Sequence, residues 1–114
     1  MLNKIVDVII DRPIHTTHPK HKDIFYEVNY GYIPNTISPV DNEEIDAYVL
    51  GVEEPITTYR GRVIAIIHRI NDEDKLIVAN QWFSEEEIIK KTYFQEKYFK
   101  SYIEMAYPIN EKIS

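Results

Sequence analysis

Four carboxylates lie within six residues in the segment 41–46, which reads Asp-Asn-Glu-Glu-Ile-Asp. On an extended strand Asp41 and Asp46 would point to opposite faces, whereas a turn through Asn42, which tolerates left-handed backbone angles, could bring them together. Convergent carboxylates repel each other, and a divalent cation relieves that repulsion. The segment is therefore interpreted as a divalent-metal loop, although the residues alone are also consistent with a solvated acidic loop.

Three histidines recur at every third position near the N-terminus: His15, His18 and His21. Such a cluster suggests zinc, but Pro19 excludes a regular helix, and we expect these side chains to be exposed in a loop. His68 lies in an apolar strand pattern and is expected to be a hydrogen-bonded core residue. The chain has no cysteine, so any metal must bind carboxylates, imidazoles or main-chain oxygens. Oxygen ligands favour hard cations such as Mg²⁺, for which Mn²⁺ can substitute.

Short strands must position these residues, because β-branched and aromatic runs alternate with turn signals. We predict five strands, at Lys4–Asp11, Ile24–Val28, Ala47–Val52, Arg62–Ile70 and Lys75–Ala79. Residues 29–36 contain Gly31 and Pro34 and are expected to form a shaped segment rather than a regular element. The acidic turn at 71–74 is expected to close a hairpin. Five strands at short spacing suggest a barrel.

A helix is predicted to begin after Ser84, because Ser-Glu-Glu-Glu supplies an N-cap with a glutamate three residues on. Apolar residues at near-helical spacing extend the predicted helix to about Met105, and residues from Pro108 onward are expected to form a loose tail. We find no internal repeat and no linker, so residues 1–114 are expected to be a single domain.

The net charge of −6 argues against a nucleic-acid partner, since that affinity comes mainly from basic residues. No apolar run approaches the roughly 20 residues that span a bilayer, and no signal segment is present, so we expect no membrane partner and a cytoplasmic location. The sequence does not fix the oligomeric state, although nine tyrosines on a short barrel would suit a homo-oligomer.

The central segment resembles the soluble family I inorganic pyrophosphatases. It reads Asn-Tyr-Gly-Tyr-Ile-Pro over 29–34, Thr-Ile-Ser over 36–38 and Asp-x-Glu-Glu-Ile-Asp over 41–46. That family has an Asn-Tyr-Gly-Tyr segment followed by Asp-Gly-Asp-(Pro or Glu)-apolar-Asp. The resemblance, over about residues 5 to 104, implies an α+β fold: a five-stranded OB-like β-barrel with one long C-terminal helix packed on it.

The resemblance also assigns roles within the acidic loop. It implies that Asp41 and Asp46 bind magnesium. It puts Glu43 where the family has an aspartate that helps to activate the nucleophilic water, so Glu43 and Asp41 are the candidate catalytic residues. Glutamate is longer than aspartate by one methylene, and misplacing a catalytic group by about 1 Å can cost on the order of 100-fold in rate.

Further site residues follow from the same resemblance. Asp72 or Asp74 matches a later metal aspartate of the family, and Lys75 matches the phosphate-binding lysine beside it. Neighbouring residues in a strand, such as Asp74 and Lys75, face opposite ways. Either Asp74 therefore lies in an irregular turn, or Asp72 is the ligand. The same cluster could be a charged hairpin tip. Tyr30 matches a tyrosine beside the metals and the phosphate. Tyr102 matches a helical tyrosine that donates to phosphate, although it also fits the apolar stripe of the helix.

The N-terminal wall of the site is shorter than in the family. Ile10-Asp11-Arg12-Pro13 resembles a strand end that brings an acidic residue to the site, but the following hairpin, which supplies basic residues, is missing. Arg12, Lys20 or Lys22 would have to substitute for them. The family lysine beside the helical tyrosine appears here as Ile103.

The leading prediction is Mg²⁺-dependent hydrolysis of inorganic pyrophosphate to two phosphates by a metal-activated water. Two alternatives stay open. One is a hydrolase of another phosphate compound, because a shortened wall leaves a more open site. The other is a catalytically impaired relative that binds metal, phosphate or a protein partner, because Glu43, Ile103 and the lost hairpin depart from the family pattern.

Overall fold

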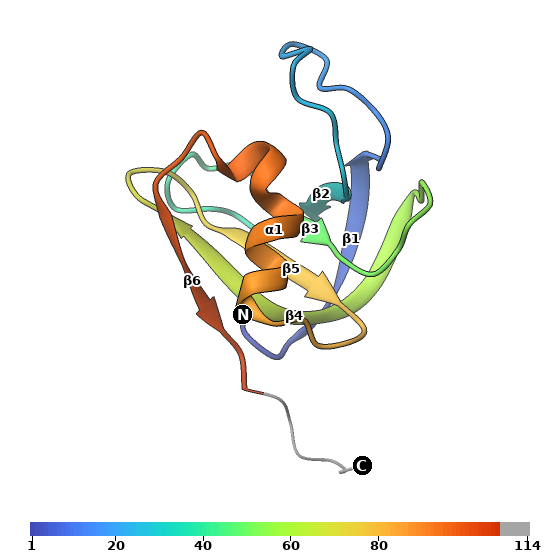
Figure 1. Cartoon of the computed structure of the whole chain (residues 1–114). Helices are drawn as coiled ribbons and strands as arrows, with labels where there is room; N and C mark the ends of the chain where they lie inside the picture. Colours follow the sequence, from blue (N-terminus) through green and yellow to red (C-terminus); the bar gives the residue numbers. More distant parts are fainter. Residues whose placement is uncertain (108–114) are drawn as a thin grey trace.

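The computed structural model describes residues 1–107, which contain six strands and one helix (Figure 1). The elements are β1 (Ile5–Arg12), β2 (Asn29–Ile33), β3 (Ile45–Val49), β4 (Thr58–Arg69), β5 (Lys75–Ala79), α1 (Glu85–Glu96) and β6 (Ser101–Met105). The tail expected from Pro108 onward lies outside the described residues. Among residues 1–107, no helix is long and apolar enough to cross a membrane.

Five of the strands close into a barrel, as the sequence predicts. They are hydrogen bonded in the order β1-β2-β3-β5-β4, and β4 pairs back onto β1. The pair β3–β5 is parallel and the others are antiparallel, including the predicted β4–β5 hairpin. With α1 lying across the outside of the barrel (Figure 1), the fold is the expected OB-like α+β architecture.

The prediction was wrong for residues 29–33, which form strand β2 instead of an irregular segment. Gly31 pairs with Ile10 of β1 and with Ala47 of β3. A Cβ atom on Gly31 would lie 1.8 Å from the carbonyl oxygen of Ile9, so the glycine permits a close approach of two strands. The predicted strand at 24–28 is also absent, and the described residues there make only the isolated bridge between Thr17 and Phe25.

The helix begins as predicted and ends earlier. The Ser84 hydroxyl accepts from the Glu87 N–H at 3.1 Å, and the Glu87 carboxylate accepts from the Ser84 N–H at 2.8 Å, which completes a capping box. The helix ends at Glu96, not near Met105, and residues 101–105 form β6. Strand β6 pairs with the last five residues of β4, which extend beyond the β1 pairing and would otherwise form an open sheet edge.

The strands divide their side chains between two apolar cores. One core fills the barrel and includes Val49 and Val78. The other lies on the outer face of the sheet beneath α1, where Tyr48 and Ile77 pack with Ile88. Because successive strand residues alternate between these faces, Asp46, two residues before Tyr48, belongs to the outer face.

Candidate functional site

Six carboxylates converge on a cavity of about 420 Å³ at one end of the barrel, which we call the acidic cavity. The carboxylates come from the end of β1, the loop at 36–44, the start of β3 and the turn before β5. The lining residues are Asp11, Tyr32, Asp41, Glu43, Glu44, Asp46 and Glu73. Both predicted metal ligands of the acidic loop, and its predicted catalytic glutamate, therefore face one space.

The acidic loop is held by its own backbone. Asn42 has a φ of 61°, the left-handed conformation expected for this turn. The Ser38 N–H donates to the Glu43 carbonyl at 2.7 Å, and the Asn42 N–H donates to the Ser38 carbonyl at 3.0 Å. The Asp41 carboxylate accepts from the Glu43 N–H at 3.0 Å. This turn folds Asp41 back toward the strand that carries Asp46.

Asp46 forms a polar cluster with two of the other predicted residues. Its carboxylate accepts from the Lys75 ammonium at 2.7 Å and from the Tyr30 hydroxyl at 2.9 Å. The contact with Lys75 follows from register, because Asp46 and Lys75 are direct partners in the β3–β5 ladder. Burial and the nearby Asp46 raise the pKa of Tyr30 well above its usual value, so Tyr30 remains a protonated donor.

Glu73 is the acidic residue that the sequence reasoning missed. Its carboxylate lies 3.3 Å from the Lys75 ammonium, and its side chain is only 11% exposed. Burial, followed by a hydrogen bond with Asp41, raises the pKa of Glu73 to about 7. The same hydrogen bond lowers the pKa of Asp41, so of these two carboxyl groups Glu73 is the one that takes up a proton more readily. Glu73 could have been found from its position two residues before Lys75, since such residues share a strand face.

The two predicted metal aspartates of the hairpin lie elsewhere. Asp74 contacts the His68 Nδ1 at 3.0 Å on the other face of the sheet, and His68 Nε2 contacts Glu104 at 2.8 Å. Asp72 accepts from Arg69 at 3.1 Å. Neither aspartate lines the acidic cavity. His68 is half-buried between carboxylates and is not the core residue that the sequence predicts.

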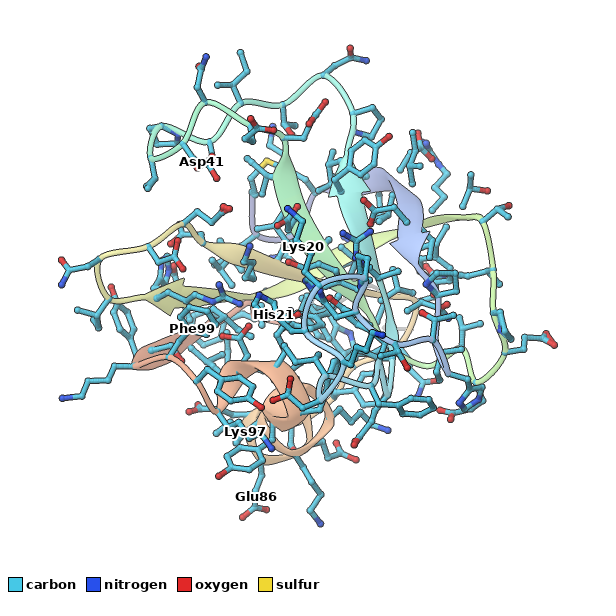
Figure 2. All side chains as sticks on the ribbon, turned by 90° about the horizontal axis from the view of Figure 1, so that it is seen from above. Lys20, His21, Asp41, Glu86, Lys97 and Phe99 are labelled. Carbon is cyan, nitrogen blue, oxygen red and sulfur yellow. The ribbon has the colours of Figure 1, made fainter. Side chains whose placement is uncertain are left out.

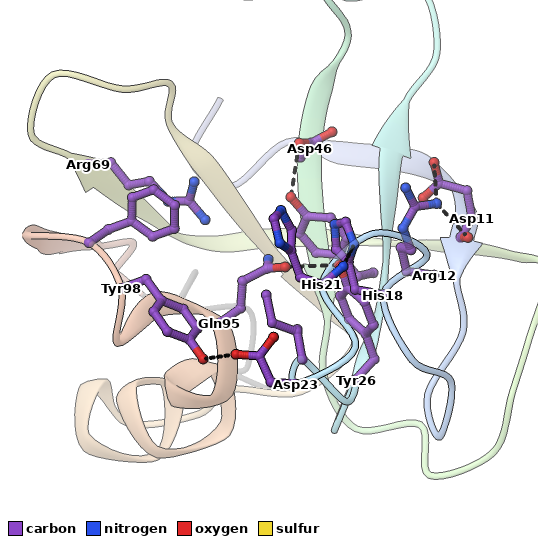
Figure 3. A pocket seen from close by; sticks show the side chains of 13 residues that line it. Asp11, Arg12, His18, His21, Asp23, Tyr26, Asp46, Arg69, Gln95 and Tyr98 are labelled. Atoms are coloured by element: carbon purple, nitrogen blue, oxygen red, sulfur yellow. Dashed lines mark hydrogen bonds and ion pairs between the residues drawn. The ribbon is translucent and has the colours of Figure 1, made fainter.

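A second cavity, of about 510 Å³, adjoins the acidic cavity and shares Asp11 and Asp46 with it (Figure 3). We call it the basic cavity because it contains two arginines and two histidines; its aromatic residues come from the segment 26–30 and from the chain just after α1. Its lining is Asp11, Arg12, His18, His21, Asp23, Ile24, Tyr26, Tyr30, Asp46, Arg69, Gln95, Tyr98 and Phe99. Arg12, a predicted substrate-binding residue, faces this cavity.

Three other predicted substrate-binding residues line neither cavity. Lys75 is buried, with its ammonium in contact with Asp46 and Glu73. Lys20 is exposed on the loop over the barrel end, near His21 (Figure 2), and its N–H donates to the His18 ring. Tyr102 is on β6 rather than on the helix, is 60% exposed and stacks on His68 at 5.0 Å. Because the helix ends at Glu96, Tyr98 rather than Tyr102 is the tyrosine from this part of the chain that lines the basic cavity.

A buried hydrogen-bond network supports the wall of the basic cavity. The Arg69 guanidinium donates to the Glu96 carboxylate at 2.6 and 3.1 Å and lies 3.6 Å from the centre of the Phe99 ring. Burial opposes the charge on Arg69, but Glu96 outweighs burial and raises the pKa of the guanidinium. The Tyr48 hydroxyl donates to the same Glu96 carboxylate at 2.6 Å. The charge of Arg69 is therefore already matched within the protein.

The side chains of the acidic cavity suit a hard divalent cation, because six of the seven are carboxylates, whose oxygen atoms are the donors that such cations prefer. Asp41 and Glu73 are hydrogen bonded to each other and shift each other's pKa in opposite directions, so negative charge is crowded there, and a cation would relieve this crowding. As the side chains stand, no three His, Asp or Glu residues within 1–107 converge closely enough to hold a metal ion. Part of the reason is Lys75, whose ammonium contacts both Asp46 and Glu73.

Comparison with known proteins gives one family. The family model for inorganic pyrophosphatase matches residues 8–106. A crystal structure of an inorganic pyrophosphatase from Ehrlichia chaffeensis superposes with a TM-score of 0.69 at 17% identity, covering 93% of this chain and 88% of that chain. One from Neisseria gonorrhoeae has a TM-score of 0.65 at 18% identity, covering 82% and 73%.

An inorganic pyrophosphatase from Coxiella burnetii is similar as well, with a TM-score of 0.62 at 18% identity over 92% of this chain and 88% of that chain. No curated protein sequence matches the chain. At these identities the solved structures establish the fold alone, whereas the family model covers most of the chain and establishes the family.

Proposed function

The chain belongs to the inorganic pyrophosphatase family, and from this premise we propose that it hydrolyses inorganic pyrophosphate to two phosphates with a divalent metal, Mg²⁺ or Mn²⁺. One observation carries the proposal. Asp46 lies at the junction between a cavity rich in carboxylates and a cavity with basic groups. A phosphoanhydride across this junction would have one phosphoryl group beside the metal ligands and the other beside cationic donors.

Asp41, Asp46 and Glu73 are the residues that would hold the metal. Their oxygen donors suit Mg²⁺, and Glu73 replaces Asp72 and Asp74 in this proposal because it lines the acidic cavity. When bound, the metal would lower the pKa of a water molecule and neutralise charge on the phosphate. Metal binding would also displace the proton that the raised pKa of Glu73 favours on that residue.

Glu43, assisted by Asp41, would accept the proton of the attacking water. The water oxygen forms a bond to one phosphorus, the bridging P–O bond breaks, and its electron pair leaves with the second phosphate. Glu43 is exposed at the mouth of the acidic cavity, so it can rotate toward the water despite its longer side chain. We therefore expect turnover that is slow for this chemistry, since a mobile base is less well positioned.

Lys75, Tyr30 and Arg12 would bind the substrate. Lys75 and Tyr30 already donate to Asp46, and both are buried, which fixes their positions before substrate binds. The positive charge of Lys75 would help to neutralise the phosphate. Arg12 extends from the end of β1 into the basic cavity, where its side chain is 32% exposed.

The direct test measures phosphate release from pyrophosphate with and without Mg²⁺, in the wild type and in Asp46→Asn. Asparagine keeps an acceptor for Tyr30 but removes the charge, so we expect release to require Mg²⁺ and to fall by about 100-fold or more in the variant. Asp74→Asn is the matched control, because Asp74 is a nearby aspartate that lies outside both cavities, and it should retain activity.

Release without metal, or an unaffected Asp46→Asn variant, would contradict the proposal. Calorimetry that detects binding of Mg²⁺ and phosphate without any turnover would also exclude an enzyme and leave a binding protein. Because the net charge is −6, we expect no nucleic-acid partner. We also propose a cytoplasmic location. Light scattering would report whether it forms a homo-oligomer.

A further inference from the structure

The loop from Pro13 to Val28, which is short and rich in histidine, is fixed in place over the basic cavity. The N–H of His15 donates to the Tyr26 carbonyl and the N–H of Tyr26 donates to the Thr16 carbonyl, each at 2.8 Å. The loop is also tied to the chain after α1, because the Tyr98 hydroxyl donates to the Asp23 carboxylate at 3.2 Å (Figure 3). Its side chains therefore hold defined positions at the cavity.

Within this loop, the His18 ring is oriented by the backbone. Its Nδ1 accepts from the N–H of Lys20 at 3.0 Å and from the N–H of His21 at 3.1 Å. Because Nδ1 accepts from two backbone N–H groups, the ring proton lies on Nε2, and burial and the neighbouring His21 also lower the pKa of His18. The ring also stacks on Tyr26, with centroids 6.3 Å apart. The Nε2–H group is thereby left as a donor for a ligand in the basic cavity.

His21 provides a second imidazole beside the first. The two rings lie 4.8 Å apart, and both line the basic cavity together with Arg12 (Figure 3). The other arginine of this cavity, Arg69, is bonded to Glu96 and to Asp72. The Arg12 guanidinium also has an acidic partner, Asp11, but this contact is longer, at 3.8 Å, and the Arg12 side chain is 32% exposed. Although the carboxylates of Asp11, Asp23 and Asp46 line the same cavity, Arg12, His18 and His21 are the basic side chains best able to receive an anion there.

We propose that His18 and His21, with Arg12, form a binding site for the phosphate group that leaves when pyrophosphate is cleaved. This inference rests on the proposed function, which puts the attacking water among the carboxylates of the acidic cavity. In phosphoryl transfer the attacking and leaving oxygens lie in line, so the leaving phosphate occupies the side away from the water. Beyond Asp46, that side is the basic cavity.

The chemistry of the site matches that group. As the bridging P–O bond breaks, its electron pair collects on the leaving phosphate, and N–H donors stabilise the growing charge. Two imidazoles and one guanidinium supply such donors. The shortened N-terminal wall would then bind phosphate through histidines instead of the basic residues of a longer hairpin.

The first test observes the histidine rings directly, without any need for turnover. Nitrogen-15 NMR of the imidazoles is recorded while inorganic phosphate is added, with and without Mg²⁺. We expect the ring signals of His18 and His21 to shift with one common dissociation constant, and the signals of His15 and His68, which line neither cavity, to stay in place. Unshifted His18 and His21 rings at saturating phosphate would overturn the proposal.

The second test uses variants that preserve the loop. In His18→Asn the side-chain oxygen can still accept from the backbone in place of Nδ1, whereas the donor at Nε2 is lost. We expect a KM for pyrophosphate, and a dissociation constant for phosphate, about 10-fold higher in His18→Asn and in His21→Ala, as for the loss of a hydrogen bond to a charged group. His15→Ala, an exposed position in the same loop, should change both by less than about 2-fold.

The two proposals fail in different ways. If phosphate shifts the His18 and His21 rings but pyrophosphate is not hydrolysed, the binding site stands and the proposed function fails. If pyrophosphate is hydrolysed while the rings and both constants are unchanged in the variants, the function stands and this binding site is excluded.

Discussion

Replacing Glu73 by glutamine tests whether the acidic cavity contains negative charge that the metal-free protein does not compensate. The Glu73 carboxyl group is buried beside Asp41, and its pKa is raised to about 7. Glutamine has nearly the same shape. Its amide can donate to Asp41 as the protonated acid does, and its carbonyl can accept from Lys75, so the substitution imitates the protonated form at every pH.

The sign of the effect follows from the direction of the shift. The pKa of Glu73 rises from 4.5 to about 7 on folding, so the folded protein holds this proton more tightly than the unfolded chain. The contribution of Glu73 to the free energy of unfolding is therefore fully present below pH 4.5 and is lost as the pH rises through 7. A shift of this size corresponds to about 3 kcal/mol. Water in the open cavity screens the charge and reduces the expected loss to about 1–2 kcal/mol.

Urea unfolding with a metal chelator present, at pH 5 and at pH 8, measures this difference. We expect wild type and Glu73→Gln to agree within about 0.5 kcal/mol at pH 5, and the variant to be more stable by about 1–2 kcal/mol at pH 8. Glu44→Gln, at an exposed carboxylate on the same cavity, is the control and should behave like the wild type. At pH 8, Mg²⁺ should stabilise the wild type more than Glu73→Gln. Wild-type and Glu73→Gln curves that stay parallel from pH 5 to pH 8 would refute the reasoning.

Three further predictions concern residues around the site. Arg69→Met should lower the free energy of unfolding by about 3–5 kcal/mol, because it leaves the buried Glu96 carboxylate unpaired, and adding Glu96→Leu should restore part of the loss in denaturant titrations. Gly31→Ala should yield little soluble folded protein, since its Cβ would overlap the Ile9 carbonyl oxygen, and circular dichroism would detect the loss of the sheet. Burial lowers the pKa of His68, but its two carboxylate partners outweigh burial and raise this pKa above its usual value. The stability that His68 contributes is therefore present below pH 6.5 and is lost as the pH rises through the pKa of the folded state. Thermal unfolding of His68→Gln should lack this pH dependence.

The barrel could be predicted from the sequence because four of its strands carry their own signals. The runs at 62–70 and 75–79 are rich in β-branched residues, and the turn between them is marked by Asn71, whose φ is 61°. The strand at 29–33 could not be recognised, because it contains Gly31, and a glycine within a strand usually weakens or interrupts it. Its presence depends on the distance between two strands in the folded barrel, which no local pattern encodes.

The end of the helix was mispredicted for a related reason. Residues after Glu96 continue the apolar spacing of the helix, yet residues 101–105 form β6 because the long strand β4 has an open edge there. Tertiary pairing thus outweighed a local periodicity. The consequence reaches the site, since Tyr102 follows β6 to the His68 face and Tyr98 remains at the basic cavity.

The alternation of strand side chains explains which acidic residues share a face. Lys75 is paired with Asp46 across β3 and β5, and both lie on the outer face of the sheet. Two residues before Lys75, Glu73 is on the same face, whereas Asp74 faces the other way and contacts His68. The resemblance directs attention to the aspartates of the hairpin, but the geometry of the strand selects the glutamate between them. If Glu73 holds the metal, this ligand is one methylene longer than the aspartates Asp41 and Asp46 beside it. A cavity with longer ligands can accept a cation at a greater distance from the strands, so Mn²⁺, which is slightly larger than Mg²⁺, should support at least comparable turnover.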